Sequence, residues 1–269
     1  MSAKTTPTGR LFSADSPDSQ AYELAVVVPV FNEEKNIGEL LLDWQNLFRS
    51  IPVRHRFLIV DDGSTDNSLS ILQSLSTRIP GIEIHTQTNA GHGPAILAGY
   101  KKALGMDHSI IEEITAVSGR PTAEWIFQID SDHQHDPSVF ATLWKNRHEF
   151  DFLLGERTDK NASLARKFVS LVSKLIVRLF YGARVKDVNS PYRLMRSSGL
   201  KEVLPRIPRN TFAPNILLTA WFVFFQARIF TTALGNRSEA IQRQSKMNGY
   251  FLRGCFQSIF QTILFRFRL

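Results

Sequence analysis

A run of seven apolar residues near the start of the chain, LAVVVPV (24–30), is the feature that most limits the fold. Four of its residues are β-branched valines and none is polar, which is typical of a strand buried on both faces of a sheet. Apolar residues then recur at helical spacing from Ile37 to Phe48. We expect this helix to open at Asn32, because asparagine is a favoured N-cap and the two glutamates after it suit the positive end of the helix dipole.

Strand and helix patterns alternate along the rest of the chain. In the first half, further strands are expected at 57–60, 82–85 and 125–129, and helices at 68–75 and 95–104. In the second half, strands are expected at 152–155 and 227–233, and helices at 163–181, 211–225 and 250–269. Such alternation predicts an α/β fold with a mixed, mostly parallel sheet flanked by helices and ending in a C-terminal amphipathic helix.

The charges divide the chain into an acidic half and a basic half. The net charge is +7, but residues 1–153 carry 12 Lys and Arg against 20 Asp and Glu, whereas residues 154–269 carry 20 against 5. The acidic half is suited to hold a cation and the basic half to face an anion. Nucleic acid, anionic lipid and a phosphorylated acceptor all satisfy the second condition, so charge alone leaves these partners open.

Composition also bears on the compartment. The chain has one cysteine, Cys255, so no internal disulfide is possible and nothing argues for an oxidising environment. Residues 1–20 lack the apolar core of a signal peptide, so we expect a disordered tail and a cytoplasmic protein. No stretch reaches the roughly 18–20 apolar residues of a membrane-spanning helix, so none is expected.

The last twenty residues predict an amphipathic helix with basic flanks, in which apolar residues recur at steps of three and four. The residues of this stripe are Leu252, Phe256, Ile259, Ile263 and Phe267. The phenylalanines of the segment suit a helix that lies in the headgroup plane of a membrane: Phe251, Phe256, Phe260, Phe265 and Phe267. The alternative is a helix packed on the domain itself, on a membrane subunit or on a second copy of the chain.

Two carboxylates follow the strand expected at 125–129. Asp130 and Asp132 are alternate residues of an extended turn, so they can converge on one divalent cation, and Gln134 lies one step further. Hard oxygen ligands suit Mg²⁺ or Mn²⁺. A cation that bridges two phosphates would stabilise a leaving nucleoside diphosphate. The alternative is a solvated acidic turn that caps the next helix.

A second acidic turn, Asp61-Asp62-Gly63-Ser64, follows the strand at 57–60. Ligands of open α/β sheets bind at the carboxyl ends of the strands. A carboxylate at this place can accept a hydrogen bond from a base N–H or a ribose hydroxyl, and Gly63 permits a tight turn. The alternative is an Asx turn in which Ser64 or Thr65 caps the following helix.

Four blocks resemble, in their order along the chain, the family-two glycosyltransferases, which have the GT-A fold. They are VVVPVFNEE (26–34), IVDDGSTDNS (59–68), NAGHGPAILAGY (89–100) and IDSDHQHDP (129–137). The resemblance implies a nucleotide-sugar donor pocket lined by Pro29, Phe31 and Glu33. It further implies that Asp62 contacts the nucleobase with support from Asp61, and that the metal ligands are Asp130, Asp132 and Gln134.

Three later blocks resemble the polyprenyl-phosphate branch of that family, which includes dolichol-phosphate mannose synthases: GERT (155–158), ARKFVS (165–170) and DVNSPYRLMR (187–196). The resemblance implies that Arg157, Arg166 and Ser170 bind the acceptor phosphate. Guanidinium groups bind phosphate bidentately, and an acceptor that is already anionic needs no general base. Asp132, Arg157 and Arg166 are therefore the expected catalytic residues.

The chain departs from the family at RSEAIQRQSKMNG (237–249), which is similar to the element Arg-x-x-Gly-x-Ser-Lys. The expected arginine falls on Ala240 and the glycine on Arg243, so either Arg237 or Arg243 replaces the arginine. These changes affect the acceptor side. We expect a tail at 1–20, a catalytic domain at 21–249 with a donor half (21–150) and an acceptor half (151–249), and the helix at 250–269.

Three functions remain open from the sequence. The first is an inverting glycosyltransferase that moves a sugar from a UDP- or GDP-sugar to polyprenyl phosphate at the cytoplasmic face of a membrane. The second uses a saccharide or other hydroxyl acceptor and needs a general base, for which the best position is Asp187 to Asn189. The third is a non-catalytic binder of nucleotide-sugars or nucleic acid. Because the aromatic residues fall mainly at core or amphipathic spacing, we expect no nucleic-acid partner.

Overall fold

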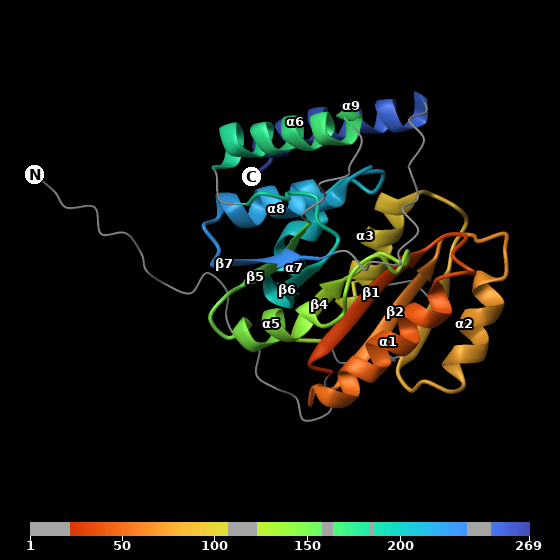
Figure 1. The fold of residues 1–269 in the computed structure, drawn as a ribbon. Coiled ribbons are helices and arrows are strands. Elements are labelled where there is room, and N and C mark those ends of the chain that lie inside the picture. Colours follow the sequence, from red (N-terminus) through yellow and green to blue (C-terminus); the bar gives the residue numbers. More distant parts are fainter. Residues whose placement is uncertain (1–21, 107–122, 158–163, 183–184, 236–248) are drawn as a thin grey trace, which may run out of the picture.

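The computed structural model describes residues 22–106, 123–157, 164–182, 185–235 and 249–269. In this part of the chain the strands form one seven-stranded sheet in the order β3-β2-β1-β4-β6-β5-β7 (Figure 1). The strands are β1 (Leu24–Val30), β2 (His55–Asp61), β3 (Ile82–Thr86), β4 (Trp125–Gln128), β5 (Phe152–Arg157), β6 (Arg193–Arg196) and β7 (Ile229–Leu234). Neighbouring strands are parallel except at β6, which runs antiparallel to β4 and β5. The predicted mixed, mostly parallel sheet is confirmed.

Helices cover both faces of the sheet, and α6 and α9 pack over α8 as an outer layer (Figure 1). The described helices are α1 (Ile37–Ser50), α2 (Ser68–Ser76), α3 (His92–Ala103), α5 (Val139–Asn146), α6 (Leu164–Tyr181), α7 (Ser197–Val203), α8 (Pro214–Phe224) and α9 (Gly249–Arg266), with a short 3-10 helix at Leu204–Arg206. No helix in the described ranges is long and apolar enough to cross a bilayer.

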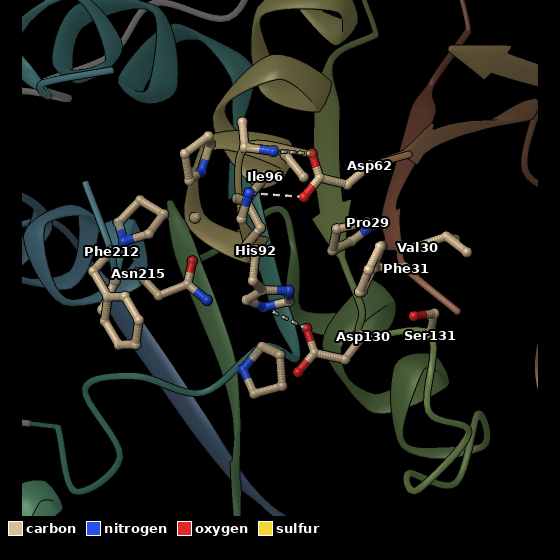
Figure 2. Close-up of a pocket in the computed structure, with 18 of the residues that line it drawn as sticks. Pro29, Val30, Phe31, Asp62, His92, Ile96, Asp130, Ser131, Phe212 and Asn215 are labelled. Carbon is tan, nitrogen blue, oxygen red and sulfur yellow. Dashed lines mark hydrogen bonds and ion pairs between the residues drawn. The ribbon is translucent and has the colours of Figure 1, made fainter. Parts of the chain in front are cut away.

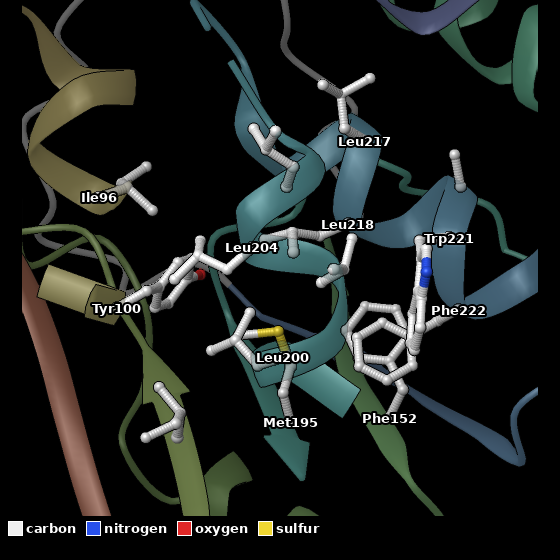
Figure 3. Packing of buried hydrophobic residues seen from close by; sticks show 14 of the residues in the cluster. Ile96, Tyr100, Phe152, Met195, Leu200, Leu204, Leu217, Leu218, Trp221 and Phe222 are labelled. Carbon is white, nitrogen blue, oxygen red and sulfur yellow. The ribbon is translucent and has the colours of Figure 1, made fainter. Parts of the chain in front are cut away.

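The alternation of side chains along β1 divides the core into two. Val26 and Val28 lie in one buried cluster with residues of α1 and α5, and Val27 lies in the other with residues of α3 and α8. This is why the run at 24–30 is apolar at every position. On the α8 side, Phe152 stacks on Phe222 with ring centroids 4.5 Å apart (Figure 3).

The first helix begins later than the sequence predicts. It starts at Ile37, and Asn32 is not its N-cap. Asn32 instead has a positive φ of 54°. Its backbone N–H donates to Ser64 Oγ, and its side-chain Oδ1 accepts from the N–H of Thr65. The polar residues after β1 therefore join the β1–α1 loop to the β2–α2 loop, a tertiary contact that no local pattern reveals.

The sequence patterns missed strand β6 and helices α5 and α7. Strand β6 has the sequence RLMR, in which Arg193 is fully buried. Its guanidinium donates to the backbone carbonyls of Ser190 and Asn215. Two arginines in four residues look like an exposed turn when only polarity is considered. The hydrogen bonds of Arg193 to Ser190 are local, but the one to the Asn215 carbonyl is tertiary and depends on how α8 packs.

The terminal helix is present, and three of the five phenylalanines predicted at a membrane surface are exposed: Phe256, Phe260 and Phe267. The side of α9 that packs on the protein carries small and polar residues, among them Gly254, Ser258 and Thr262. Phe265 is also buried, so its predicted position at a membrane surface is wrong. The exposed side carries Phe256, Phe260, Leu264 and Phe267. The side chain of Phe251 lies outside the described residues.

Candidate active site

A cavity of about 670 Å³ lies at the carboxyl ends of β1, β2 and β4 (Figure 2). Acidic residues from these strand ends form one part of its lining: Glu33, Asp62, Asp130 and Asp132. Arg157, at the end of β5, and His92, at the start of α3, also line it. This is the edge of an open α/β sheet at which ligands bind, and its size is ordinary for a small-molecule site.

Asp130 and Asp132 enter the cavity because they directly follow β4. Asp130 Oδ1 lies 3.4 Å from His92 Nε2. Removal from water opposes ionisation of Asp130, but the charge of His92 outweighs this and holds the pKa of Asp130 below its usual value. Burial and the neighbouring charge of Asp130 raise the pKa of Asp132 to about 6. The charge of His92 favours the ionised form of both carboxylates, whereas the charge of Asp130 opposes ionisation of Asp132.

This pair fits a divalent cation that a phosphorylated ligand would share. No group of three or more His, Cys, Asp or Glu side chains placed to hold a metal occurs within the described residues. Mg²⁺ is commonly bound by one or two carboxylates together with substrate phosphates, so two protein ligands suffice. Asp130 Oδ1 is buried and forms no hydrogen bond of normal geometry among the described residues; its contact there is the 3.4 Å ion pair with His92 Nε2, whose positive charge a cation could replace.

Asp62 fixes the loop between β3 and α3. Its Oδ1 accepts from Gln87 Nε2 at 2.7 Å and from the N–H of Ala90 at 2.9 Å, and its Oδ2 accepts from the N–H of Gly91 at 2.8 Å. The predicted need for a glycine at 63 is supported by geometry. Gly63 has a φ of +73°, and a Cβ there would lie 2.9 Å from the backbone nitrogen of Asn89.

The end of β1 supplies three residues that the sequence predicts for the donor pocket, namely Pro29, Phe31 and Glu33. The Phe31 side chain is 44% exposed, whereas Glu33 is buried. Glu33 Oε2 accepts from Asn36 Nδ2 at 2.7 Å, and the Glu33 N–H donates to Ser68 Oγ at 2.8 Å. The loop after β1 therefore holds Glu33 in a fixed position at the cavity.

Arg157 is held by a bidentate ion pair with Asp187. Its Nε lies 2.7 Å from Asp187 Oδ2 and its Nη2 lies 3.1 Å from Oδ1, and Nη2 also donates to the carbonyl of Asn189. Burial alone would raise the pKa of Asp187, but Arg157 outweighs it and holds that pKa below its usual value. Asp187 is therefore a weak base, while Arg157 is fixed beside it in the lining of the cavity.

The wall opposite the carboxylates comes from the second half of the chain. It includes Asn210, Phe212, Asn215 and Gln257. Gln257 of α9 donates from Nε2 to the carbonyl of Asn210 at 3.0 Å. On the other side, Gly93 of α3 lies against this segment so closely that a Cβ would be 2.0 Å from the Thr211 carbonyl oxygen. The segment is thus enclosed between α3 and α9.

The structure brings together most of the predicted donor residues. The predicted residues that line the cavity are Pro29, Phe31, Glu33, Asp62, Asp130, Asp132 and Arg157. Asp61 is buried behind it, where its Oδ1 accepts from the Ser64 N–H, and Gln134 is not part of the lining. Ser170 is exposed on α6 and also lies outside the lining. The Arg166 side chain and all of Arg237 and Arg243 fall outside the described residues.

Several lining residues were not predicted. His92 lies within the block NAGHGP, so that block was the available signal for it. No sequence pattern pointed to Asn210, Phe212 or Asn215, because the position of their segment beside the cavity depends on tertiary packing. Gln257 lies on the polar side of the terminal helix, where glutamine usually indicates solvent.

Comparison with known proteins places this geometry in a family. The model of the family described as "Glycosyl transferase family 2" matches residues 25–204, which is more than half of the chain. A dodecaprenyl-phosphate galacturonate synthase of Rhizobium johnstonii is 29% identical over 72% of this chain and 54% of its own length. An undecaprenyl-phosphate 4-deoxy-4-formamido-L-arabinose transferase of Pseudomonas fluorescens is 26% identical over 71% and 52%. The chain spans about half the length of these two relatives.

Solved structures share the fold at lower identity. Glucosyl-3-phosphoglycerate synthase of Mycobacterium tuberculosis in complex with UDP is 16% identical and superposes with a TM-score of 0.61, over 91% of this chain and 80% of its own. The same enzyme with Mn²⁺, UDP-glucose and phosphoglyceric acid gives a TM-score of 0.56 over the same shares, at 15% identity. At such identity the likeness extends to the architecture of the sheet and its helices.

Proposed function

Because the chain belongs to glycosyl transferase family 2 and has its GT-A fold, we propose that it is an inverting glycosyltransferase with a polyprenyl-phosphate acceptor. The donor is a UDP- or GDP-sugar, and the reaction takes place at the cytoplasmic face of a membrane. The observation that carries the proposal is the single cavity at which Asp62, Asp130, Asp132 and Arg157 meet. The polyprenyl-phosphate relatives, matched over about half their length, support the acceptor.

In the proposed donor complex, the nucleotide occupies the part of the cavity beside Pro29, Phe31 and Asp62. Each Asp62 oxygen has two lone pairs, and the three loop hydrogen bonds leave one acceptor position for a base N–H or a ribose hydroxyl. Asp61 supports this wall from behind. Asp130 and Asp132 would hold Mg²⁺ or Mn²⁺, which when bound supplies Lewis-acid stabilisation of the leaving diphosphate. Gln134, which lies outside the cavity lining, is the third ligand that the family resemblance implies.

The transfer itself is a single displacement. An oxygen of the acceptor phosphate forms a bond to the anomeric carbon while the bond from that carbon to the nucleoside diphosphate breaks, and the diphosphate leaves with the electron pair. The configuration inverts because attack and departure occur on opposite sides. Arg157 orients the acceptor phosphate through guanidinium N–H groups, with Arg166, Ser170 and one of Arg237 and Arg243 as the further acceptor residues.

The state of Asp187 argues for a phosphate acceptor over a hydroxyl acceptor. A hydroxyl acceptor needs a general base whose pKa lies near the working pH. Asp187 is the best candidate by position, yet its pKa is lowered and both its oxygens bind Arg157. An acceptor phosphate brings its own negative charge and removes the need for this base.

Membrane attachment is proposed to use α6 and α9 together. Their exposed apolar residues form one outer face: Leu171, Leu175, Leu179, Phe256, Phe260, Leu264 and Phe267. Neither helix contains an acidic residue. Lys174 and Arg178 of α6 and Arg253 of α9 are basic residues of these helices, and each cation near an anionic surface contributes about 1 kcal/mol. Interfacial binding of this type needs both apolar burial and positive charge.

The reaction is tested by measuring nucleotide release from a panel of UDP- and GDP-sugars with Mn²⁺ or Mg²⁺, with and without polyprenyl phosphate in liposomes. We expect release that requires metal and lipid phosphate and that is lost in Asp132→Ala. Nucleotide-sugar binding without lipid-stimulated release would refute the polyprenyl-phosphate acceptor and favour a hydroxyl acceptor. Absence of any nucleotide binding would refute the enzyme assignment.

The membrane face is tested separately by sedimentation with vesicles containing anionic lipid. Phe260→Ser combined with Leu175→Ser should lower vesicle binding, because both side chains are more than half exposed on the proposed face. The matched control is Leu42→Ser, since Leu42 is 49% exposed on α1. Equal vesicle binding by both variants would contradict the assignment of this face, as would unchanged binding after deletion of residues 250–269.

A further inference from the structure

The wall of the cavity that faces the carboxylates differs from them in chemistry. It contains carboxamides and an aromatic ring: Asn189, Asn210, Asn215, Gln257 and Phe212. Within the described lining the cationic side chains are Arg157 and His92, and each faces a carboxylate, Asp187 and Asp130 respectively. The side opposite the proposed metal site therefore presents neutral donors and acceptors.

Asn215 is the most constrained member of this wall. The residue is 4% exposed. Figure 2 shows its side chain between Phe212 and His92, directed into the cavity. Its Oδ1 is buried and has no hydrogen-bond partner among the described residues. An unpaired buried polar atom is costly, about 1–3 kcal/mol, so its persistence at a cavity indicates that a ligand completes it.

The backbone beneath Asn215 is held in place by the interior. The carbonyl oxygen of Asn215 accepts from Arg193 Nη1 at 3.0 Å and from Thr219 Oγ1 at 2.9 Å. Arg193 is fully buried, and burial lowers its pKa to about 10, so it remains charged at neutral pH. A charged donor makes a stronger hydrogen bond than a neutral one, so the first turn of α8 is fixed relative to β6.

We propose that Asn215 is a specificity-determining residue that binds a hydroxyl group of the transferred sugar, and that the carboxamide wall selects a neutral, polyhydroxylated sugar over a uronic acid. A hydroxyl both donates and accepts, so it satisfies a carboxamide in either orientation. A sugar carboxylate on this side would meet carboxamides, because the cations of the described lining are engaged elsewhere: His92 pairs with Asp130, and Arg157 pairs with Asp187 and is assigned to the acceptor phosphate. The proposal rests on the proposed function, because the ligand is the sugar of a nucleotide-sugar donor.

The test compares each nucleotide-sugar with its own nucleoside diphosphate in equilibrium binding with Mn²⁺. The probes are UDP, UDP-glucose, UDP-galactose, UDP-N-acetylglucosamine, UDP-glucuronate, GDP and GDP-mannose. The ratio of the two affinities isolates the contribution of the sugar. For the neutral sugar with the largest ratio, Asn215→Ala should lower that ratio about fivefold, the value of one neutral hydrogen bond, and leave diphosphate affinity within about twofold.

Two further variants separate ligand contact from structural support. Asn215→Asp keeps the shape and an acceptor oxygen, so it should retain more of the neutral-sugar ratio than Asn215→Ala while binding UDP-glucuronate still more weakly. Asn215→Asp also provides the test if Asn215→Ala does not fold. Asn146→Ala on α5, outside the cavity lining, is the matched control and should leave every ratio unchanged.

The outcomes are distinguishable. An unchanged sugar ratio in Asn215→Ala, a ratio near one for every neutral sugar, or tighter binding of UDP-glucuronate than of UDP-glucose overturns the inference and leaves the proposed function intact. Failure of the wild-type protein to bind either UDP or GDP overturns the proposed function, and the inference with it.

Discussion

The close approach of Gly93 to the segment 211–213 gives a prediction with a calculable size. A Cβ at position 93 would lie 2.0 Å from the Thr211 carbonyl oxygen and 2.6 Å from that of Phe212. Ordinary contact begins at 3.4 Å, so Gly93→Ala requires the segment or the start of α3 to move by about 1.4 Å. Both contacts are backbone atoms, which no rotamer change can remove.

We therefore expect Gly93→Ala to lower the free energy of unfolding by about 3 kcal/mol, the upper end of the range for overpacking. For a protein of this size that corresponds to a fall in Tm of about 6–12 °C. Because the displaced segment carries Phe212 and leads into Asn215, nucleotide-sugar affinity should fall in the same variant. Thermal unfolding followed by circular dichroism measures the first effect, and equilibrium binding measures the second.

Gly38→Ala is the matched control. Gly38 lies in the first turn of α1, and its Cβ would meet Ile71 Cγ2 at 3.8 Å, an ordinary contact. Alanine should therefore raise stability by up to about 1 kcal/mol through helix propensity. If Gly93→Ala were as stable as Gly38→Ala and bound donor normally, the segment 211–213 would be free to move and the fixed wall of the cavity would be refuted.

Three further predictions follow from single contacts. Removal of divalent metal with EDTA should reduce nucleotide-sugar affinity at least tenfold. Added Mn²⁺ should restore this affinity in the wild type but not in Asp132→Ala. Binding that does not depend on metal would contradict the carboxylate site. Asp187→Asn should destabilise the protein most at neutral pH. The native pKa of Asp187 is lowered, so its contribution to stability is present above about pH 4 and is lost as the pH falls through the native pKa; the urea unfolding curves of the two proteins should therefore approach each other at acidic pH. Arg193→Met should lower the free energy of unfolding by about 3 kcal/mol, because the carbonyls of Ser190 and Asn215 lose their buried donor; an unchanged urea midpoint would show that these carbonyls find other partners.

The donor half was predictable from sequence because its signals are local. The apolar run at 24–30 specifies a buried strand, and the acidic residues that matter follow directly at strand ends. In a parallel sheet those ends meet at one edge, so Asp62, Asp130 and Asp132 converge without any knowledge of tertiary contacts. The pairing of His92 with Asp130 required more, since it depends on how α3 approaches the end of β4.

The acceptor half was less predictable because polar residues there are buried. Arg193 and Asn215 are fully or almost fully enclosed, and each is polar where a core residue would be apolar. In α9 the prediction failed at Phe265, which is buried. Ser258 and Thr262 are buried beside it, because their hydroxyls donate to carbonyls four residues earlier in the same helix. Small polar residues can then face the protein, while Phe256, Phe260 and Phe267 are exposed.

Helix α9 contributes both to the cavity lining and to the proposed membrane face. Gln257 of α9 lines the cavity and binds the Asn210 carbonyl, while the adjacent Phe256 is 71% exposed on the proposed membrane face. On the same helix, Gly254 leaves room for the Phe212 ring, which a Cβ would approach to 2.5 Å. A surface bound through α9 would therefore lie within a helix diameter of the cavity wall. A lipid phosphate held at that surface could reach the cavity without leaving the membrane, as the proposed acceptor requires.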